Sequence, residues 1–158
     1  MERVAIFVDV QNVYYTSRQT YRKNFDYNAF WRKATANRQV VTAYAYAVER
    51  GDTKQREFQN ILRAIGFEVK LKPFIQRADG SAKGDWDVGI TIDMMDAASE
   101  ADTLILVSGD GDFSILCNRL TEQGGKKVEV YGVPALTAAS LMQSASEFVP
   151  IDQQLLLG

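Results

Sequence analysis

The sequence predicts an α/β protein built on a mostly parallel sheet of five or six strands. Apolar runs of strand length recur along the 158-residue chain, at 3–9, 40–48, 67–72, 103–108 and 127–131. Segments of helical period separate them, near 28–37, 53–65, 86–101, 112–123 and 135–145. Such alternation is typical of a parallel sheet with helices on both faces. The strands are apolar almost throughout, which favours burial of both faces.

Individual segments support this assignment. The run 3–9 carries five consecutive apolar residues before Asp9. Segment 53–65 places its apolar residues on one helical stripe and stops at Gly66, a residue suited to a helix C-terminus. Segment 112–123 repeats the pattern and stops at Gly124. The stretch Gln76–Lys83 is the one long polar loop that we expect.

Bulk composition indicates a single domain over residues 1–158. The length is enough to bury a full core, and 46% of the residues are hydrophobic. No apolar stretch is long enough to span a bilayer. The chain enters a strand pattern at once, so we expect no leader peptide. Cys117 is the only cysteine, which excludes an internal disulfide and a cysteine zinc site and favours a cytoplasmic protein.

Charge is unevenly distributed, although the net charge is only −2. Between Asp85 and Asp112 there are eight acidic residues and no Lys or Arg. The segment Tyr14–Arg38 has six basic residues and one acid, Asp26. An acidic spot beside a basic surface is what a metal-dependent enzyme acting on phosphodiesters needs. A solvated charged surface is the competing explanation for most of these residues.

Carboxylates follow two of the predicted strands. Asp9 ends the first, and Asp110 and Asp112 follow the run 103–108. In open parallel sheets, ligands bind beyond the carboxyl ends of the strands. If these two strands are neighbours, the carboxylates converge there.

Helix capping is the alternative explanation for Asp110 and Asp112, because aspartate is a preferred N-cap. One cap needs one carboxylate, however, and this turn offers two together with Ser108. We expect Gly109 and Gly111 to allow a tight backbone and a close ligand.

A third acidic segment, Lys83-Gly84-Asp85-Trp86-Asp87-Val88, leads into the predicted helix 86–101. Asp85 suits the cap of this helix, and Asp87 is then free to point at the other acids. Asp93 lies about 120° around the helix from Asp87 at 3.6 residues per turn, so both a supporting role and metal contact stay open for it. Lys83 is a candidate partner for these acids or for a phosphate.

Converging carboxylates point to a hard divalent cation. Several carboxylates at one point would be partly protonated at neutral pH unless a positive charge compensates them. Mg²⁺ or Mn²⁺ takes such oxygen ligands and can also bind a substrate phosphate. The chain has no histidine, so a general base must be a carboxylate or a water on the metal. These features predict metal-assisted phosphodiester hydrolysis.

Substrate contacts are expected along the segment after Asp9. Asn12 can build a turn, hold Asp9 or touch substrate. Aromatic rings beside cations suit single-stranded nucleic acid. Tyr14, Tyr15 and Arg18 are the surface candidates for this contact, because they follow Asn12 directly. Phe30 and Trp31 are expected to lie in the core instead.

Three motifs together resemble the NYN-domain proteins of the LabA type, relatives of the PIN-domain nucleases. They are Phe7-Val8-Asp9-Val10-Gln11-Asn12, Lys83-Gly84-Asp85-Trp86-Asp87-Val88 with Asp93, and Ser108-Gly109-Asp110-Gly111-Asp112-Phe113. Trp86 departs from the small aliphatic residue of the family pattern.

The resemblance implies a three-layer α/β/α sandwich and a Mg²⁺- or Mn²⁺-dependent ribonuclease-type site. We expect an endoribonuclease, and the aromatic and basic residues after Asp9 favour single-stranded rather than duplex RNA. The resemblance assigns the metal and catalytic roles to Asp9, Asp87, Asp110 and Asp112 and leaves Asp93 in support. Asn12, Lys83, Ser108, Tyr15 and Arg18 are then the candidate substrate contacts. A homodimer is left open, with the C-terminal leucines at 155–157 docking on their own domain or on a second subunit.

Other functions compete with this one. Haloacid-dehalogenase-like phosphatases share a strand-end aspartate, but they need an acid where this chain has Gln11. A non-catalytic module that binds nucleic acid or protein and keeps the acidic site is the main rival. Nucleotide binding at Gly109-Asp110-Gly111 lacks the phosphate-loop spacing and puts acids where a phosphate needs N–H groups.

Overall fold

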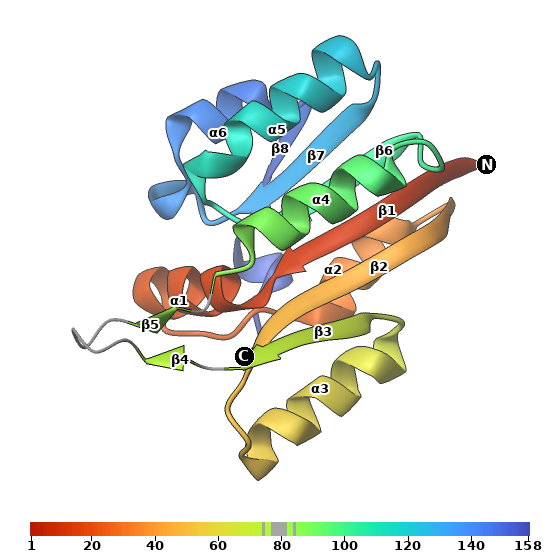
Figure 1. Cartoon of the computed structure of the whole chain (residues 1–158). Coiled ribbons are helices and arrows are strands. Elements are labelled where there is room, and N and C mark those ends of the chain that lie inside the picture. Colours follow the sequence, from red (N-terminus) through yellow and green to blue (C-terminus); the bar gives the residue numbers. More distant parts are fainter. Residues whose placement is uncertain (74, 77–81, 84) are drawn as a thin grey trace.

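A six-stranded, all-parallel sheet forms the centre of the molecule, in the order β3-β2-β1-β6-β7-β8 (Figure 1). The computed structural model describes residues 1–73, 75–76, 82–83 and 85–158. The strands of the sheet are β1 (Glu2–Asp9), β2 (Arg38–Glu49), β3 (Glu68–Pro73), β6 (Thr103–Val107), β7 (Lys127–Gly132) and β8 (Glu147–Pro150). The predicted α/β class and mostly parallel sheet are confirmed. Strand β8 is an edge strand that the apolar pattern of the sequence did not indicate.

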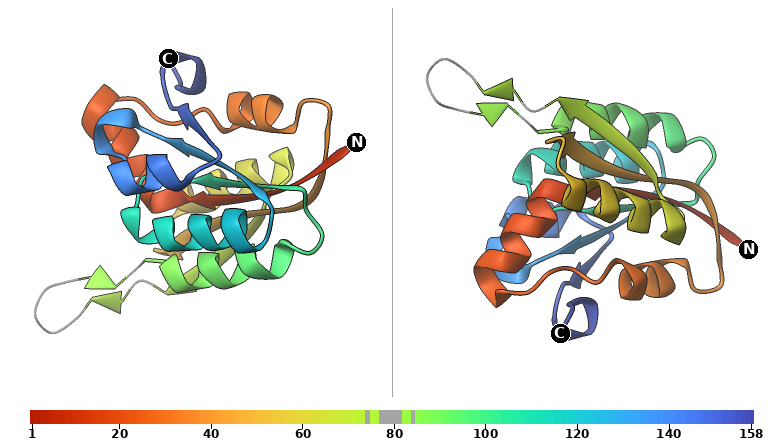
Figure 2. Two further views of the ribbon diagram at one scale, coloured as in Figure 1. Left: turned by 90° about the horizontal axis from the view of Figure 1, so that it is seen from above. Right: turned by 90° about the horizontal axis from the view of Figure 1, so that it is seen from below.

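Helices cover both faces of this sheet (Figure 2). They are α1 (Val10–Tyr21), α2 (Tyr27–Thr35), α3 (Thr53–Ile65), α4 (Asp87–Ala97), α5 (Ser114–Asn118) and α6 (Ala139–Ser144). The shorter helical segments are η1 (Gly111–Phe113), η2 (Arg119–Gln123), η3 (Pro134–Leu136) and η4 (Gln153–Leu155). No described helix combines the length and the apolar character needed to cross a membrane.

Two apolar clusters hold the layers together. Alternate residues of β1 point to opposite faces, so Ile6 joins the cluster beneath α1, α2 and α3, and Phe7 joins the one beneath α4, α5 and α6. Phe30 is fully buried and Trp31 packs against the same core, as predicted. The three-layer α/β/α arrangement follows from this division.

Helix α1 was not predicted. Its first turn contains Asn12, for which a turn was one of three roles considered from the sequence, and only Val13 and Ser17 of the helix are buried. This face is too narrow to stand out as an apolar stripe. The helix matters for function because it starts directly after Asp9.

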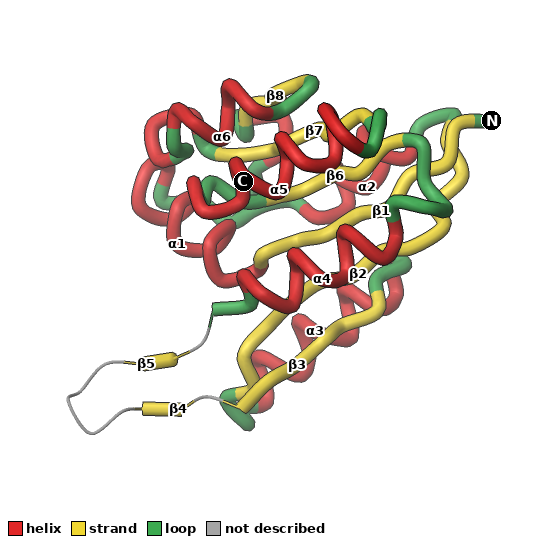
Figure 3. The backbone as a smooth tube through the Cα atoms, turned by 45° about the horizontal axis from the view of Figure 1, so that its top comes forward, coloured by secondary structure: helices red, strands yellow, loops and turns green. Residues whose placement is uncertain are grey.

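The prediction of a polar loop over 76–83 is wrong at both ends of that range. Strands β4 (Ile75–Gln76) and β5 (Ala82–Lys83) pair antiparallel there, beyond the carboxyl end of the main sheet (Figure 3). Residues 77–81 lie outside the described part of the chain.

The C-terminal leucines dock mainly on their own domain. Leu155 and Leu156 are buried, and Leu156 forms an antiparallel bridge with Phe25. This resolves the alternative left open for two of the three residues, and Leu157 stays half exposed.

Candidate metal centre

Strands β1 and β6 are parallel neighbours, with Val8 opposite Val107. Their carboxyl ends therefore meet at one edge of the sheet, and the residues that follow them come together. The convergence expected from the sequence depended on this pairing. The pairing is now observed.

Asp9 connects the two strand ends through a short chain of hydrogen bonds. Its side chain is only 8% exposed. The hydroxyl of Ser108 donates to Oδ2 of Asp9 at 3.1 Å, and the Ser108 hydroxyl oxygen itself accepts from the backbone N–H of Asp110 at 3.2 Å. These bonds link the turn after β1 to the turn after β6.

Asn12 provides a second connection between these turns. Its Oδ1 accepts from the backbone N–H of Gly109 at 2.9 Å. The amide oxygen is therefore occupied in fastening α1 to the turn after β6. Contact between Asn12 and substrate stays a prediction.

Asp110 both caps a helix and belongs to an acidic cluster. Its side chain accepts from the backbone N–H of Asp112 at 2.9 Å, which caps η1. Capping and function were posed as alternatives from the sequence, and for Asp110 the cap is real. The cap uses Oδ1 and leaves Oδ2 for other partners.

Three carboxylates converge beside this cap. One oxygen each from Asp87, Asp110 and Asp112 can be chosen so that all lie within 4.8 Å of one another. Asp87 comes from the first residue of α4, and the other two come from the turn after β6. Asp9 is outside this set of three, although the charge of Asp110 acts on it.

The proton affinities of two of these acids reflect burial. Burial raises the pKa of Asp9 to about 6, and the charges of Asp110 and Asp85 add to the shift, while the Ser108 hydroxyl and the Asn12 backbone oppose it. Burial also raises the pKa of Asp87 to about 7, helped by its hydrogen bond with Asp110 and that neighbour's charge. Both carboxylates are penalised as anions near neutral pH.

The donor set fits a hard divalent cation. All three ligand candidates are carboxylates, and none of the ion pairs between described residues involves them. Asp110 and Asp87 are half buried and Asp112 is exposed, so the cluster is open to solvent and to a substrate. Mg²⁺ and Mn²⁺ prefer such oxygen ligands and retain waters on the open side.

Trp86 explains how α4 presents Asp87. Its indole Nε1 donates to the carbonyl of Ala47 in β2 at 2.9 Å, and its ring lies 5.3 Å from that of Tyr46. A Cβ on Gly89 would lie 2.6 Å from the indole, so glycine is required where the ring crosses the helix. The bulky residue before the acid thus fixes the first turn of α4 to the sheet.

Lysines of the edge strand β3 complete this support. Lys72 donates to the carbonyl of Asp85 at 2.6 Å, and its Nζ lies 4.5 Å from the ring centroid of Trp86. The Asp85 side chain accepts from the N–H of Asp87 at 3.2 Å, although Trp86 is the residue at the N-cap position. Lys72 and its neighbour on the same side of β3, Lys70, were not singled out from the sequence. Their spacing of two residues is the one sequence feature that sets them apart.

Asp93 lies outside the acidic cluster and has partners of its own. Its Oδ2 accepts from the hydroxyl of Tyr46 at 2.8 Å and from Nζ of Lys70 at 2.7 Å. Burial and this hydrogen bond raise the pKa of Tyr46. Asp93 therefore ties α4 to β2 and β3, which corresponds to the supporting alternative considered for it.

The glycines of the turn after β6 face the protein rather than a ligand. A Cβ on Gly109 would meet the carbonyl oxygen of Leu136 at 2.8 Å, and one on Gly111 would meet Ala138 at 2.8 Å. This agrees with the tight backbone expected at Gly109 and Gly111, and the close approach of a ligand to these glycines stays a prediction. They allow the turn to pack against η3 and the start of α6.

The remaining substrate candidates lie on or near α1. Tyr14 and Tyr15 are each half exposed, with ring centroids 5.5 Å apart. Arg18 is exposed and donates to the carbonyl of Arg22 at 3.0 Å, which closes the end of α1. The side chain of Lys83 lies outside the described part of the chain.

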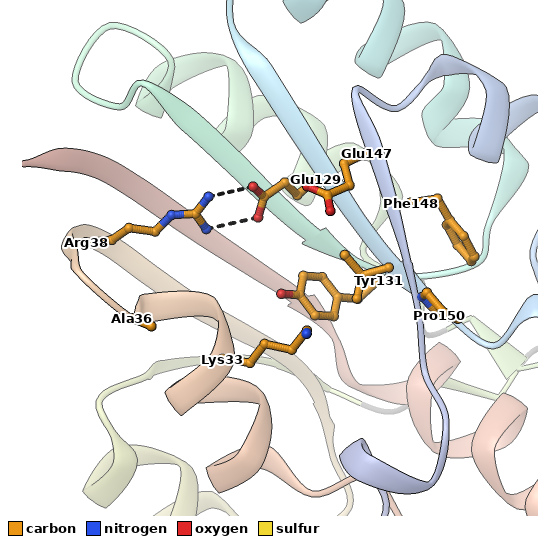
Figure 4. A pocket seen from close by; sticks show the side chains of 9 residues that line it. Lys33, Ala36, Arg38, Glu129, Tyr131, Glu147, Phe148 and Pro150 are labelled. Carbon is orange, nitrogen blue, oxygen red and sulfur yellow. Dashed lines mark hydrogen bonds and ion pairs between the residues drawn. The ribbon is translucent and has the colours of Figure 1, made fainter.

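A hollow of about 360 Å³ lies elsewhere, and none of its lining residues belongs to the acidic cluster. It is lined by Lys33, Ala36, Arg38, Glu129, Tyr131, Glu147, Phe148, Val149 and Pro150. Figure 4 shows the Arg38 guanidinium paired with the Glu129 carboxylate, at 3.0 and 2.6 Å. Arg38, Glu129 and Glu147 of this hollow are thus paired within the protein.

The strand order and the acidic cluster agree with a PIN-like α/β domain. The NYN domain family model matches residues 3–152, and the chain belongs to that family.

Two relatives give the comparison more detail. The "Low amplitude and bright protein LabA" of Synechococcus elongatus is 32% identical over 123 residues, which are 70% of this chain and 63% of that protein. The chain thus spans less than two thirds of that relative. A crystal structure of a protein of unknown function from Vibrio parahaemolyticus is 60% identical, with a TM-score of 0.94, and covers 99% of this chain and 96% of that one.

Proposed function

We propose that this protein is a Mg²⁺- or Mn²⁺-dependent ribonuclease that hydrolyses phosphodiester bonds of single-stranded RNA. The observation that carries the proposal is the convergence of Asp87, Asp110 and Asp112 within 4.8 Å at the carboxyl edge of the sheet. The family membership supports phosphodiester chemistry, because NYN domains are PIN-like nuclease domains.

These three aspartates would hold the cation. When bound, the cation polarises the scissile phosphate and lowers the pKa of an attacking water. Metal binding also removes the cost of placing like charges together, because it supplies the positive charge that the cluster lacks. The open side of the cluster leaves room for the phosphate.

Asp9 has a positioning role in this proposal. It is buried and receives the Ser108 hydroxyl, and Ser108 in turn receives the N–H of Asp110. The Asp9 carboxylate thereby fixes the turn that carries two of the three ligands. As the chain has no histidine, the proton removed from water passes to a carboxylate or to solvent.

Exposed rings beside cations favour single-stranded RNA as the substrate. Tyr14 and Tyr15 offer stacking surfaces on the helix that begins at Asp9, and Arg18 is one turn further on. Unpaired bases can stack on such rings, whereas the bases of a duplex are already stacked.

Cleavage of a fluorescently labelled single-stranded RNA with Mn²⁺ tests the proposal. Asp110→Asn should lose at least about 100-fold in rate, because the ligand charge is gone while an amide oxygen still accepts the Asp112 N–H. Glu57→Gln, an exposed acid on α3, is the matched control and should cleave as the wild type does.

Parallel reactions separate the alternatives. Duplex RNA and single-stranded DNA should be cut more slowly than single-stranded RNA. Binding of RNA by wild type and Asp110→Asn alike, with cleavage by neither, would indicate the non-catalytic binding module instead. Equal cleavage by both proteins would remove the acidic cluster from the mechanism.

A further inference from the structure

Helix α4 is apolar on two sides. Ile90, Met94 and Ala97 are buried in the core beneath it. On the opposite side Val88, Ile92 and Met95 are 72%, 53% and 47% exposed. Their spacing of four and then three residues places them on one stripe. An exposed apolar stripe of this kind marks an interaction site when it belongs to a larger apolar patch.

Helix α5 presents a further exposed apolar residue near α4. It lies beside α4 on the same face of the sheet, as both views in Figure 2 show, and the two helices share one core cluster. Ile115 on its first turn is 79% exposed. We call Val88, Ile92, Met95 and Ile115 the α4–α5 patch.

The size of the patch suits an interface. Four side chains exposed to this degree present on the order of 400 Å² of surface, within the range of roughly 300–600 Å² for the largest apolar patch on a typical monomer, which is often functional. Two such patches facing each other, together with a polar rim, would bury roughly 1,200 Å² of total surface, which is enough for a specific dimer.

The patch has charged residues of opposite sign at its two sides. Asp96 follows Ile92 by four residues on α4, and Arg119 follows Ile115 by four residues at the end of α5. Both are exposed, and neither forms an ion pair with another described residue. The patch thus has an anion on its α4 side and a cation on its α5 side.

We propose that this patch binds the same patch on a second copy of the chain. The two copies are related by a two-fold axis that lies in the interface, parallel to α4 and α5 and midway between them. That rotation lays α4 of one copy on α5 of the other, so each apolar stripe covers its partner. It also brings Asp96 of each copy toward Arg119 of the other. A two-fold interface needs this self-complementarity, because the same surface serves both sides.

Molar mass in solution, measured by sedimentation, tests the dimer. Wild type should have twice the chain mass of 17.7 kDa, and Ile92→Glu should return it to the single-chain value. Ile61→Glu is the matched control, because Ile61 on α3 is an isoleucine of the same 53% exposure on the other face of the sheet, and it should remain a dimer.

A charge swap tests the orientation. Asp96→Arg and Arg119→Asp should each weaken dimerisation about tenfold, and the double variant should recover it. A monomeric wild type at the concentrations used overturns the proposal, as does a dimer that Ile92→Glu leaves intact. If the wild type is a monomer and Ile92→Glu binds RNA more weakly than the wild type, the patch is a nucleic-acid surface and not a dimer interface.

Discussion

At the scale of single residues, the candidate centre places carboxylates where their charge is costly. Asp9 is buried at the end of a strand, and Asp87 shares a hydrogen bond with Asp110. A protein that needed only stability would replace these residues by neutral ones. Their raised pKa values are therefore an expected mark of a functional site.

The metal-free protein should become more stable as the pH falls from 8 to about 5. The folded-state pKa values of Asp9 and Asp87 are about 6 and about 7, above the ordinary values of unfolded aspartate near 3.9. In this window the folded state takes up protons that the unfolded state does not, so the free energy of unfolding rises. Because the chain has no histidine, no imidazole group titrates in this pH range.

Urea unfolding in the presence of a chelator measures this dependence. Asp87→Asn removes one of the two groups, so its unfolding midpoint should rise less on acidification than that of wild type. A wild-type midpoint that falls between pH 8 and pH 6 would contradict the assignment. Metal binding should show the opposite trend, because protons compete with the cation.

At the scale of elements, the starts of α4 and η1 determine the geometry of the cluster. The sequence indicated both helix starts from their acids and the turn from its glycines. It gave no sign that the indole of Trp86 spans from α4 to Ala47 in β2, because that contact depends on the register of strands far apart in sequence. The same reason hid the Lys70–Asp93 pair, which joins β3 to α4.

Gly89→Ala should destabilise the protein although alanine favours helices. The propensity gain is about 1 kcal/mol, whereas the new Cβ would lie 2.6 Å from a ring that is anchored by its own hydrogen bond. Overpacking of this kind costs about 1–3 kcal/mol, so a net loss of up to about 2 kcal/mol is expected. Denaturant unfolding measures the change.

A second pair of variants isolates the cause. In a Trp86→Ala background the ring is gone, and Gly89→Ala should then stabilise the protein by its helix propensity. If Gly89→Ala destabilises both backgrounds equally, the indole is not what requires glycine at this position.

At the scale of the whole molecule, strand order creates the site. Acids at the ends of two apolar runs predicted a shared edge, and the adjacency of β1 and β6 provides it. The sequence could not indicate which acids would meet most closely. Asp9 stays one hydrogen-bonded residue away from the cluster because its side chain is buried against Ser108.

An ion pair also spans the sheet. Arg38 begins β2, and Glu129 lies on β7, two strands beyond β1, yet the two side chains form paired hydrogen bonds. Arg38 also binds Glu2 of β1 at 2.8 Å. The Arg38–Glu129 pair thus joins β2 to β7, which are not neighbours, and the Arg38–Glu2 pair joins the neighbouring strands β2 and β1.

Arg38→Met should cost about 3 kcal/mol in the free energy of unfolding, because it leaves the buried Glu129 carboxylate with Lys127 at 3.5 Å as its remaining cation among the described residues. Arg38→Met combined with Glu129→Leu should recover most of the loss, because no buried charge is then unpaired. Chemical unfolding of the three proteins gives the comparison. A double variant as unstable as the single one would show that packing of the arginine stem matters more than its charge.

The cation itself is the most direct test of the central claim that these carboxylates form a metal site. Anomalous diffraction from crystals soaked in Mn²⁺ should show one peak or more among the carboxylates of Asp87, Asp110 and Asp112, and no peak there in crystals of Asp110→Asn. Strong Mn²⁺ peaks elsewhere with none at this cluster, in crystals where its oxygens face solvent, would contradict the account.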